Sequence, residues 1–179
     1  MEHNMGDCTV PARLPAKEDA MRILLAVDES ESSHRAVKYV GSLLHRTPDV
    51  SVTLFHVLKP MPRALLEHGG SENPVVEAQM DQELHKDQED WIRKERESEC
   101  HVLKEACQIL KEAGFDTQRV TLKFGHEDDI ARNILEEARG HETIVVGRHG
   151  TSRIKRFFGG GVTNQLLREA KGFAVWVVE

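Results

Sequence analysis

The chain has 179 residues, of which 39% are apolar and 30% charged, and its formal net charge at pH 7 is −6. This length and composition predict one soluble globular domain with a single core. Dedicated nucleic-acid-binding domains carry a basic surface, so nucleic acid is not an expected partner of this acidic chain. The sequence contains no apolar run of membrane length, and no membrane association is expected.

The first twenty residues contain turn-forming residues and lack the apolar stretch of a secretory signal. We expect residues 1–20 to be a flexible N-terminal extension and residues 21–179 to form the domain. The three cysteines form no Cys-x-x-Cys pair, and Cys100 and Cys107 are two helical turns apart, too far for a disulfide. This cysteine pattern favours a reducing, cytoplasmic location.

The predicted strands are short apolar runs that alternate with helices along the chain. Runs rich in apolar and β-branched residues predict strands at 22–28, 50–57, 119–124, 143–147 and 173–178. Apolar residues at helical spacing predict helices at 29–45, 77–113, 127–139 and 162–170. Strands that are buried along their length and alternate with helices are typical of a parallel, doubly wound α/β sheet.

The second predicted helix is unusually long and differs between its two halves. Residues 58–76 hold three prolines and a Gly-Gly pair and predict a loop, and Gly114 predicts the end of the helix. The first half of the helix is almost entirely polar. The second half carries an apolar stripe formed by Val102, Leu103, Ala106, Cys107 and Leu110. We therefore expect the first half to extend along or beyond the domain and the second half to pack on the sheet.

Doubly wound sheets bind ligands beyond the carboxyl ends of their strands, where the winding direction reverses. This rule selects Asp28, Val57 and Gly147, which end the first, second and fourth predicted strands. The Asp28 carboxylate could accept a hydrogen bond from a ribose hydroxyl or an adenine amine. The alternative is that Asp28 only caps the helix that follows it.

The segment from Gly147 to Leu167 contains two glycines three residues apart, a triple glycine and several cations without any acid. Glycines allow backbone N–H groups to approach phosphate oxygens, and a following helix offers its unpaired N-terminal donors to an anion. The alternative is a solvated turn that happens to be basic. The segment is not a P-loop, because it does not end in Gly-Lys-Ser/Thr. Its cations are Arg148, Arg153, Lys155 and Arg156.

No side-chain pair in the sequence has the signature of a nucleophile and its base. The ten histidines are scattered and lack the clustered spacing of metal ligands. We therefore predict no catalytic residues and no metal ligands.

The order of the elements, together with AVDES after the first strand, FHV at the second and VVGRHG at the fourth, resembles the universal stress protein family. Nucleotide-binding members of that family carry Gly-x-x-Gly, nine residues, then Gly and Ser or Thr. Gly147, Gly150 and Gly160 match this pattern, but Gly161 stands where the Ser or Thr is expected. The resemblance covers about residues 21–178.

The resemblance implies one doubly wound five-stranded parallel sheet of order 3-2-1-4-5, flanked by four helices, of the adenine-nucleotide alpha-hydrolase-like type. It also implies a homodimer formed through the last strand, Phe173–Val178. The implied ligand is ATP or another adenine nucleotide, with or without Mg²⁺. The residues that the resemblance assigns to this ligand are Ala26, Val27, Asp28, Val57, Gly147, Arg148, His149, Gly150, Gly160, Gly161, Val162 and Thr163.

The expected function is that of a nucleotide-binding sensor or regulator in a stress response, with at most weak ATP hydrolysis. Two alternatives are a family member that binds no nucleotide and acts through protein contacts, and a slow ATPase. Gly161 removes a hydroxyl donor and a helix cap, each a loss of about 1 kcal/mol. We therefore expect weaker nucleotide binding rather than none.

Overall fold

The computed structural model describes residues 21–126, 129–148 and 161–179. Within these ranges the chain alternates strands and helices, and two short 3-10 turns, η1 (Arg63–Leu65) and η2 (Thr117–Arg119), interrupt the connections. None of the described helices combines the length and the apolar character that crossing a bilayer requires. The strands and helices are β1 (Met21–Ala26), α1 (Glu31–Leu44), β2 (Val50–Val57), α2 (Pro74–Glu112), β3 (Val120–Gly125), α3 (Ile130–Glu137), β4 (Thr143–Gly147), α4 (Val162–Glu169) and β5 (Ala174–Val178).

The five strands form one sheet in the order β3-β2-β1-β4-β5, and every neighbouring pair is parallel. This confirms the fold and the strand order expected from the sequence. Continuous apolar runs are the reason, because such strands are stable only where helices cover both faces of the sheet. Leu24 and Leu25 in β1 point to opposite faces, and neither side chain has any exposed surface.

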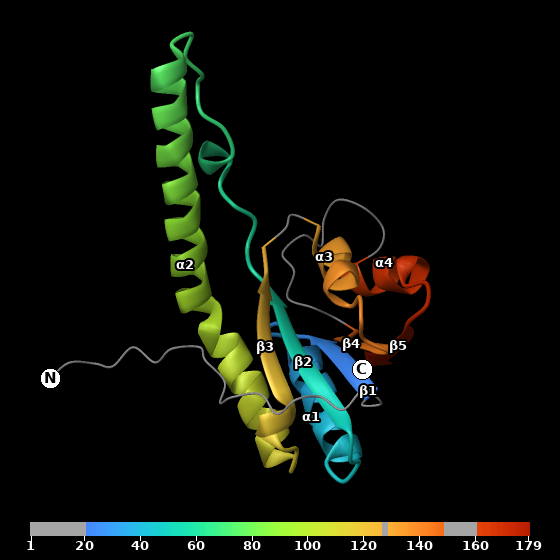
Figure 1. Cartoon of the computed structure of the whole chain (residues 1–179). Helices are drawn as coiled ribbons and strands as arrows, with labels where there is room; N and C mark the ends of the chain where they lie inside the picture. Colours follow the sequence, from blue (N-terminus) through green and yellow to red (C-terminus); the bar gives the residue numbers. More distant parts are fainter. Residues whose placement is uncertain (1–20, 127–128, 149–160) are drawn as a thin grey trace, which may run out of the picture.

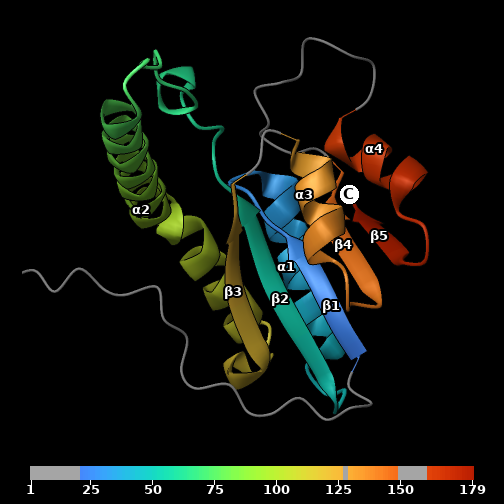
Figure 2. The same cartoon turned by 45° about the horizontal axis from the view of Figure 1, so that its top comes forward.

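The helices cover the two faces in pairs, as Figure 2 shows. The second half of α2 packs with α1 in one hydrophobic core, to which Leu103 and Leu110 belong. Helices α3 and α4 pack on the opposite face in a second core, which includes Ile134 and Leu166. Each helix contributes one apolar side, as expected from the spacing of its apolar residues.

The first half of α2 stands away from the sheet, and the segment 58–73 runs beside it (Figure 1). This confirms that the polar half extends beyond the domain. The helix begins at Pro74, however, so the predicted loop is three residues too long. The Asn73 side chain caps the helix by accepting a hydrogen bond from the Val75 N–H at 3.0 Å. Proline is favoured at the first position of a helix, where no N–H partner is lost.

Candidate functional site

The carboxyl ends of β1, β2 and β4 lie at one edge of the sheet, next to the start of α1 (Figure 2). Strand β1 leads through α1 to β2 on one side, and β4 leads through α4 to β5 on the other, so the winding reverses between β1 and β4. Paired residues of β1 and β4 end at Leu25 and Val145, whereas β4 stays paired with β5 to Gly147. Beyond Leu25, β1 and β4 are no longer paired, and this is the place where a doubly wound sheet binds its ligand.

Asp28 holds the turn between β1 and α1. Its Oδ1 accepts hydrogen bonds from the Ser30 N–H at 3.0 Å and the Ser30 hydroxyl at 2.5 Å. Its own N–H donates to Ser33 Oγ at 3.0 Å. The N-cap of α1 is Ser30, whose hydroxyl oxygen accepts from the Ser33 N–H, so the alternative that Asp28 is the cap is wrong. These bonds fix the Asp28 carboxylate at the edge where the ligand is expected.

Gly147 lies against the first turn of α1. A Cβ atom at this position would come within 2.7 Å of the Ser32 carbonyl carbon and 2.8 Å of its carbonyl oxygen. Only a glycine lets β4 approach α1 this closely. On the other side, the Thr163 hydroxyl donates to the Gly147 carbonyl at 3.1 Å. Gly147 thus joins the starts of α1 and α4 at one point of the edge.

Helix α4 begins here without a side-chain cap. Its N-cap residue is Gly161, with φ −61° and ψ 172°, and no side chain among the described residues caps the first turn. The first N–H groups of a helix have no partner within the helix, and together with the helix dipole they attract an anion. Val162 and Thr163 form this first turn. Three further predicted ligand-binding residues, His149, Gly150 and Gly160, lie outside the described residues.

The Arg148 side chain, which the resemblance assigns to the nucleotide, forms an ion pair within the protein. Its guanidinium forms an ion pair with the Glu179 carboxylate, and its backbone N–H donates to the Val178 carbonyl at 2.8 Å. Arg35 donates from Nε to the Glu179 carbonyl at 3.0 Å. A phosphate at this edge would therefore compete with Glu179 for the Arg148 side chain.

A buried polar cluster beside the edge was missed in the sequence. His56 and Glu99 are each only 8% exposed. His56 donates from Nδ1 to the Val27 carbonyl at 2.8 Å, and its Nε2 lies 3.6 Å from Glu99 Oε2. Lys59 donates to Glu99 Oε1 at 2.5 Å. The cluster ties the middle of α2 to the ends of β1 and β2. The only sign of this cluster in the sequence was His56, a polar residue among the apolar residues at the end of β2.

The charges of this cluster shift the pKa of Glu99. Burial raises the pKa of its carboxyl, but the hydrogen bond and charge of Lys59, together with His56 and His101, lower it, and the net shift is downward from the usual 4.5. The same hydrogen bond raises the pKa of Lys59. The Glu99 carboxylate is therefore more stable as an ion in the folded protein than in the unfolded chain.

We expect Glu99→Gln to lower the free energy of unfolding at pH 7 by about 1 kcal/mol, a small value because Lys59 is largely exposed. Glutamine imitates the protonated acid. The folded pKa is lowered, so the contribution of Glu99 is present above pH 4.5 and is lost as the pH falls through the folded pKa. Urea unfolding of both proteins from pH 7 to pH 3 should show the two curves converging in acid. A constant difference between them would contradict the assignment.

Comparison with known proteins identifies a family. The model of the universal stress protein family matches residues 20–179. A universal stress protein of Mycolicibacterium smegmatis (strain ATCC 700084 / mc(2)155) is 25% identical over 158 residues, which cover 87% of this chain and 47% of that protein. The chain thus spans about half the length of this curated relative.

Solved structures of the same family share the fold. A universal stress protein in complex with cAMP has a TM-score of 0.59 and 18% identity, covering 89% of this chain and 97% of its own. One from Archaeoglobus fulgidus in complex with dAMP has a TM-score of 0.53 and 18% identity, covering 89% and 98%. A family protein from Burkholderia pseudomallei has a TM-score of 0.55 and 19% identity, covering 90% and 98%. With the family match over nearly the whole chain, these findings show that the protein belongs to the universal stress protein family.

Proposed function

We propose that this protein binds an adenine nucleotide at the edge between β1 and β4 and acts as a nucleotide-dependent sensor or regulator in a stress response. The observation that carries the proposal is the uncapped start of α4, which lies beside Gly147 where the winding of the sheet reverses. Unpaired helix donors at this place suit a phosphate group. The Asp28 and Val57 ends of β1 and β2 would then receive the adenosine part.

Two related structures support the choice of ligand. One universal stress protein was solved with cAMP and another with dAMP, and both share the fold of this chain. Both ligands combine an adenine base with a phosphate. We propose ATP, ADP or AMP for this protein, with or without Mg²⁺, because an open helix N-terminus can bind a phosphate chain of any of these lengths.

Equilibrium dialysis against ATP, ADP, AMP and adenosine tests the proposal. We expect at least one nucleotide to bind below millimolar concentration. Gly161→Asp should weaken nucleotide binding at least tenfold, because its carboxylate repels phosphate, while adenosine binding should stay unchanged. Aspartate is a good N-cap, so this variant should fold as well as the wild type. No nucleotide binding below millimolar concentration would favour the alternative, a family member that acts through protein contacts alone.

Gly69→Asp is the matched control for this experiment. Gly69 lies on the segment beside the first half of α2, and an added Cβ there meets no atom within 4 Å. The control adds the same charge away from the sheet edge. An equal loss of binding in both variants would mean that the change in net charge of the protein, and not the position of the charge at α4, weakens nucleotide binding.

We also propose that two copies pair through β5. β5 is the outermost strand on its side of the sheet, so the backbone N–H and C=O groups on its outer side do not pair with another strand of this sheet. Its Val177 side chain is 38% exposed, which suits an apolar contact with a second copy. Pairing of two edge strands would cover both features at once.

A further inference from the structure

Three side chains that commonly bind metals converge on the part of the molecule that stands away from the sheet. We call this part the arm and define it as residues 58–90, which comprise the segment beside α2 and the first half of that helix (Figure 1). His68 belongs to the segment, and Glu77 and Asp81 belong to the first two turns of α2. Each offers one ligand atom, and the three atoms lie within 4.8 Å of one another.

The backbone places these side chains together. Glu77 and Asp81 are four residues apart, so they share one face of α2. His68 Nε2 lies 2.8 Å from Asp81 Oδ1. A tetrahedral metal with bonds near 2.1 Å keeps its ligand atoms roughly 3.4 Å apart, so the triad needs only a small adjustment to bind one.

The other contacts of the triad are compatible with a metal. Glu77 accepts from the Ser71 N–H at 2.5 Å through Oε2, and its second oxygen can serve as a ligand. In the metal-bound form Nε2 of His68 coordinates and the proton of the ring sits on Nδ1. The contact from the Gly70 N–H to Nδ1, which is long at 3.2 Å, then opens.

The chemistry of the triad selects the kind of ion. Mg²⁺ and Ca²⁺ take oxygen ligands, whereas an imidazole nitrogen with two carboxylates suits Zn²⁺, with water at the fourth position. The surroundings attract cations, because acids far outnumber lysines and arginines in residues 64–90, which we call the outer arm. Between residues 64 and 90 the only lysine or arginine is Lys86, and the acids are Glu67, Glu72, Glu77, Asp81, Glu83, Asp87, Glu89 and Asp90.

We propose that His68, Glu77 and Asp81 bind one Zn²⁺ ion, which fastens the segment 58–73 to the start of α2. The site lies on a different part of the chain from the sheet edge between β1 and β4, and it does not depend on nucleotide binding. In the described contacts, the segment is held there mainly by hydrogen bonds, such as the one from the Gln88 side chain to the Leu65 carbonyl at 2.7 Å. A bound metal would make the outer arm considerably more rigid.

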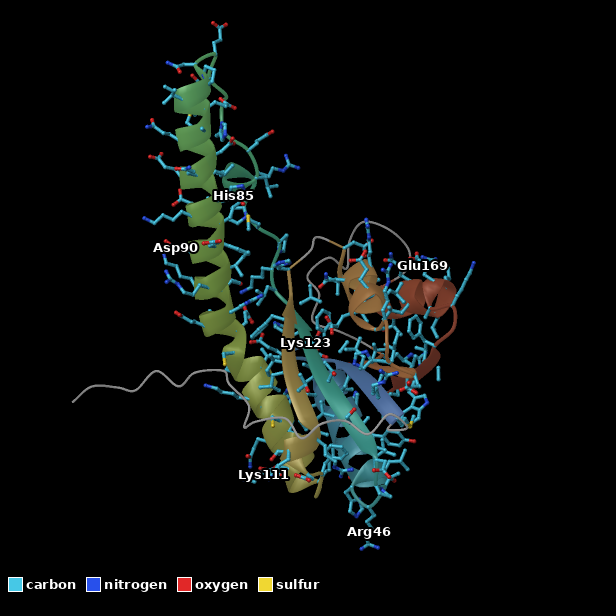
Figure 3. The ribbon with its side chains drawn as sticks, in the orientation of Figure 1. Arg46, His85, Asp90, Lys111, Lys123 and Glu169 are labelled. Carbon is cyan, nitrogen blue, oxygen red and sulfur yellow. The ribbon has the colours of Figure 1, made fainter. Side chains whose placement is uncertain are left out.

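The test is a calorimetric titration of the full-length, tag-free, chelator-treated protein with Zn²⁺. We expect His68→Ala and Asp81→Asn each to lose one Zn²⁺ equivalent, or to bind it at least tenfold more weakly than the wild type. The matched control is the double variant Glu83→Gln, His85→Ala, which removes one carboxylate and one imidazole from α2 close to Asp81 and should retain that equivalent. Figure 3 labels His85 on this part of the helix.

A second measurement separates a site from non-specific binding. Zn²⁺ should protect residues 58–73 of the wild type and of the control from limited proteolysis, but not those of the two triad variants. The proposal is overturned if the triad variants match the wild type in zinc stoichiometry and affinity, or if the control loses as much. Displacement of Zn²⁺ by millimolar Mg²⁺ would likewise overturn it, because it would reveal only a general acidic surface.

Discussion

Gly147→Ala is expected to lower the free energy of unfolding by about 3 kcal/mol and to weaken nucleotide binding at least tenfold. The new Cβ would lie 2.7 Å from the Ser32 carbonyl carbon, and backbone atoms cannot rotate away as a flexible side chain does. Either β4 or the first turn of α1 must move, and such overpacking costs a few kcal/mol. Urea unfolding followed by nucleotide titration measures both effects on the same sample.

Gly161→Ala is the control for this change, because it adds the same methyl group at the same edge of the sheet. An added Cβ at Gly161 meets no atom of the described residues within 4 Å, and φ of −61° suits any residue. Its stability should therefore stay within about 0.5 kcal/mol of the wild type. Equal destabilisation of the two variants would show that Gly147 is not held tightly against Ser32.

The sheet could be predicted from the sequence because its strands are apolar runs and the central ones, such as β1 and β4, are buried on both faces. Such a run needs helices on either side, and the helices between the runs supply them. β2 (Val50–Val57) and β4 (Thr143–Gly147) begin and end where the sequence places them. The start of α2 was harder to predict, because Asn73 and Pro74 suit a loop as well as a helix N-terminus.

The edge of the sheet could be located from the sequence, but the partners of its side chains could not. The order of strands and helices alone predicts which carboxyl ends of strands lie beside the point where the winding reverses. The ion pair between Arg148 and Glu179 joins two strands that become neighbours only in the folded sheet. The contact between His56 and Glu99 joins β2 to the middle of α2 in the same way. Neither pair has a regular spacing along the chain.

The prediction of no metal ligands was based on the spacing of residues along the chain. His68 and Asp81 are thirteen residues apart and match no metal-binding pattern in the sequence. They meet because the segment 58–73 turns back along α2, a course that depends on the prolines, glycines and caps between them. Clusters formed by a folded-back segment can be found only in three dimensions.

The second half of α2 connects the arm to the sheet edge. Glu29, just after β1, accepts from His101 on α2 at 2.9 Å, and His56 at the end of β2 lies beside Glu99. Both contacts join the sheet edge that we propose for the nucleotide to the second half of α2, just past its middle. The helix of the arm therefore continues directly into the second half of α2, which these contacts attach to the sheet edge.

Gly161→Ser is expected to tighten ATP binding about fivefold to tenfold and to raise the free energy of unfolding by a few tenths of a kcal/mol. The serine oxygen can accept from an N–H of the first turn of α4, and its hydroxyl proton can at the same time reach a phosphate oxygen. One such hydrogen bond contributes about 1 kcal/mol to binding. Among the described residues, an added Cβ meets no atom within 4 Å.

Calorimetric titration of the wild type, Gly161→Ser and Gly161→Ala with ATP and with adenosine separates the hydroxyl from the added carbon. Only the serine variant should gain affinity for ATP, and none of the three should differ in affinity for adenosine. An equal gain in the alanine variant would assign the effect to a stiffer backbone before α4. A gain for adenosine would mean that α4 faces the base or the ribose, so that the phosphates lie elsewhere along the edge.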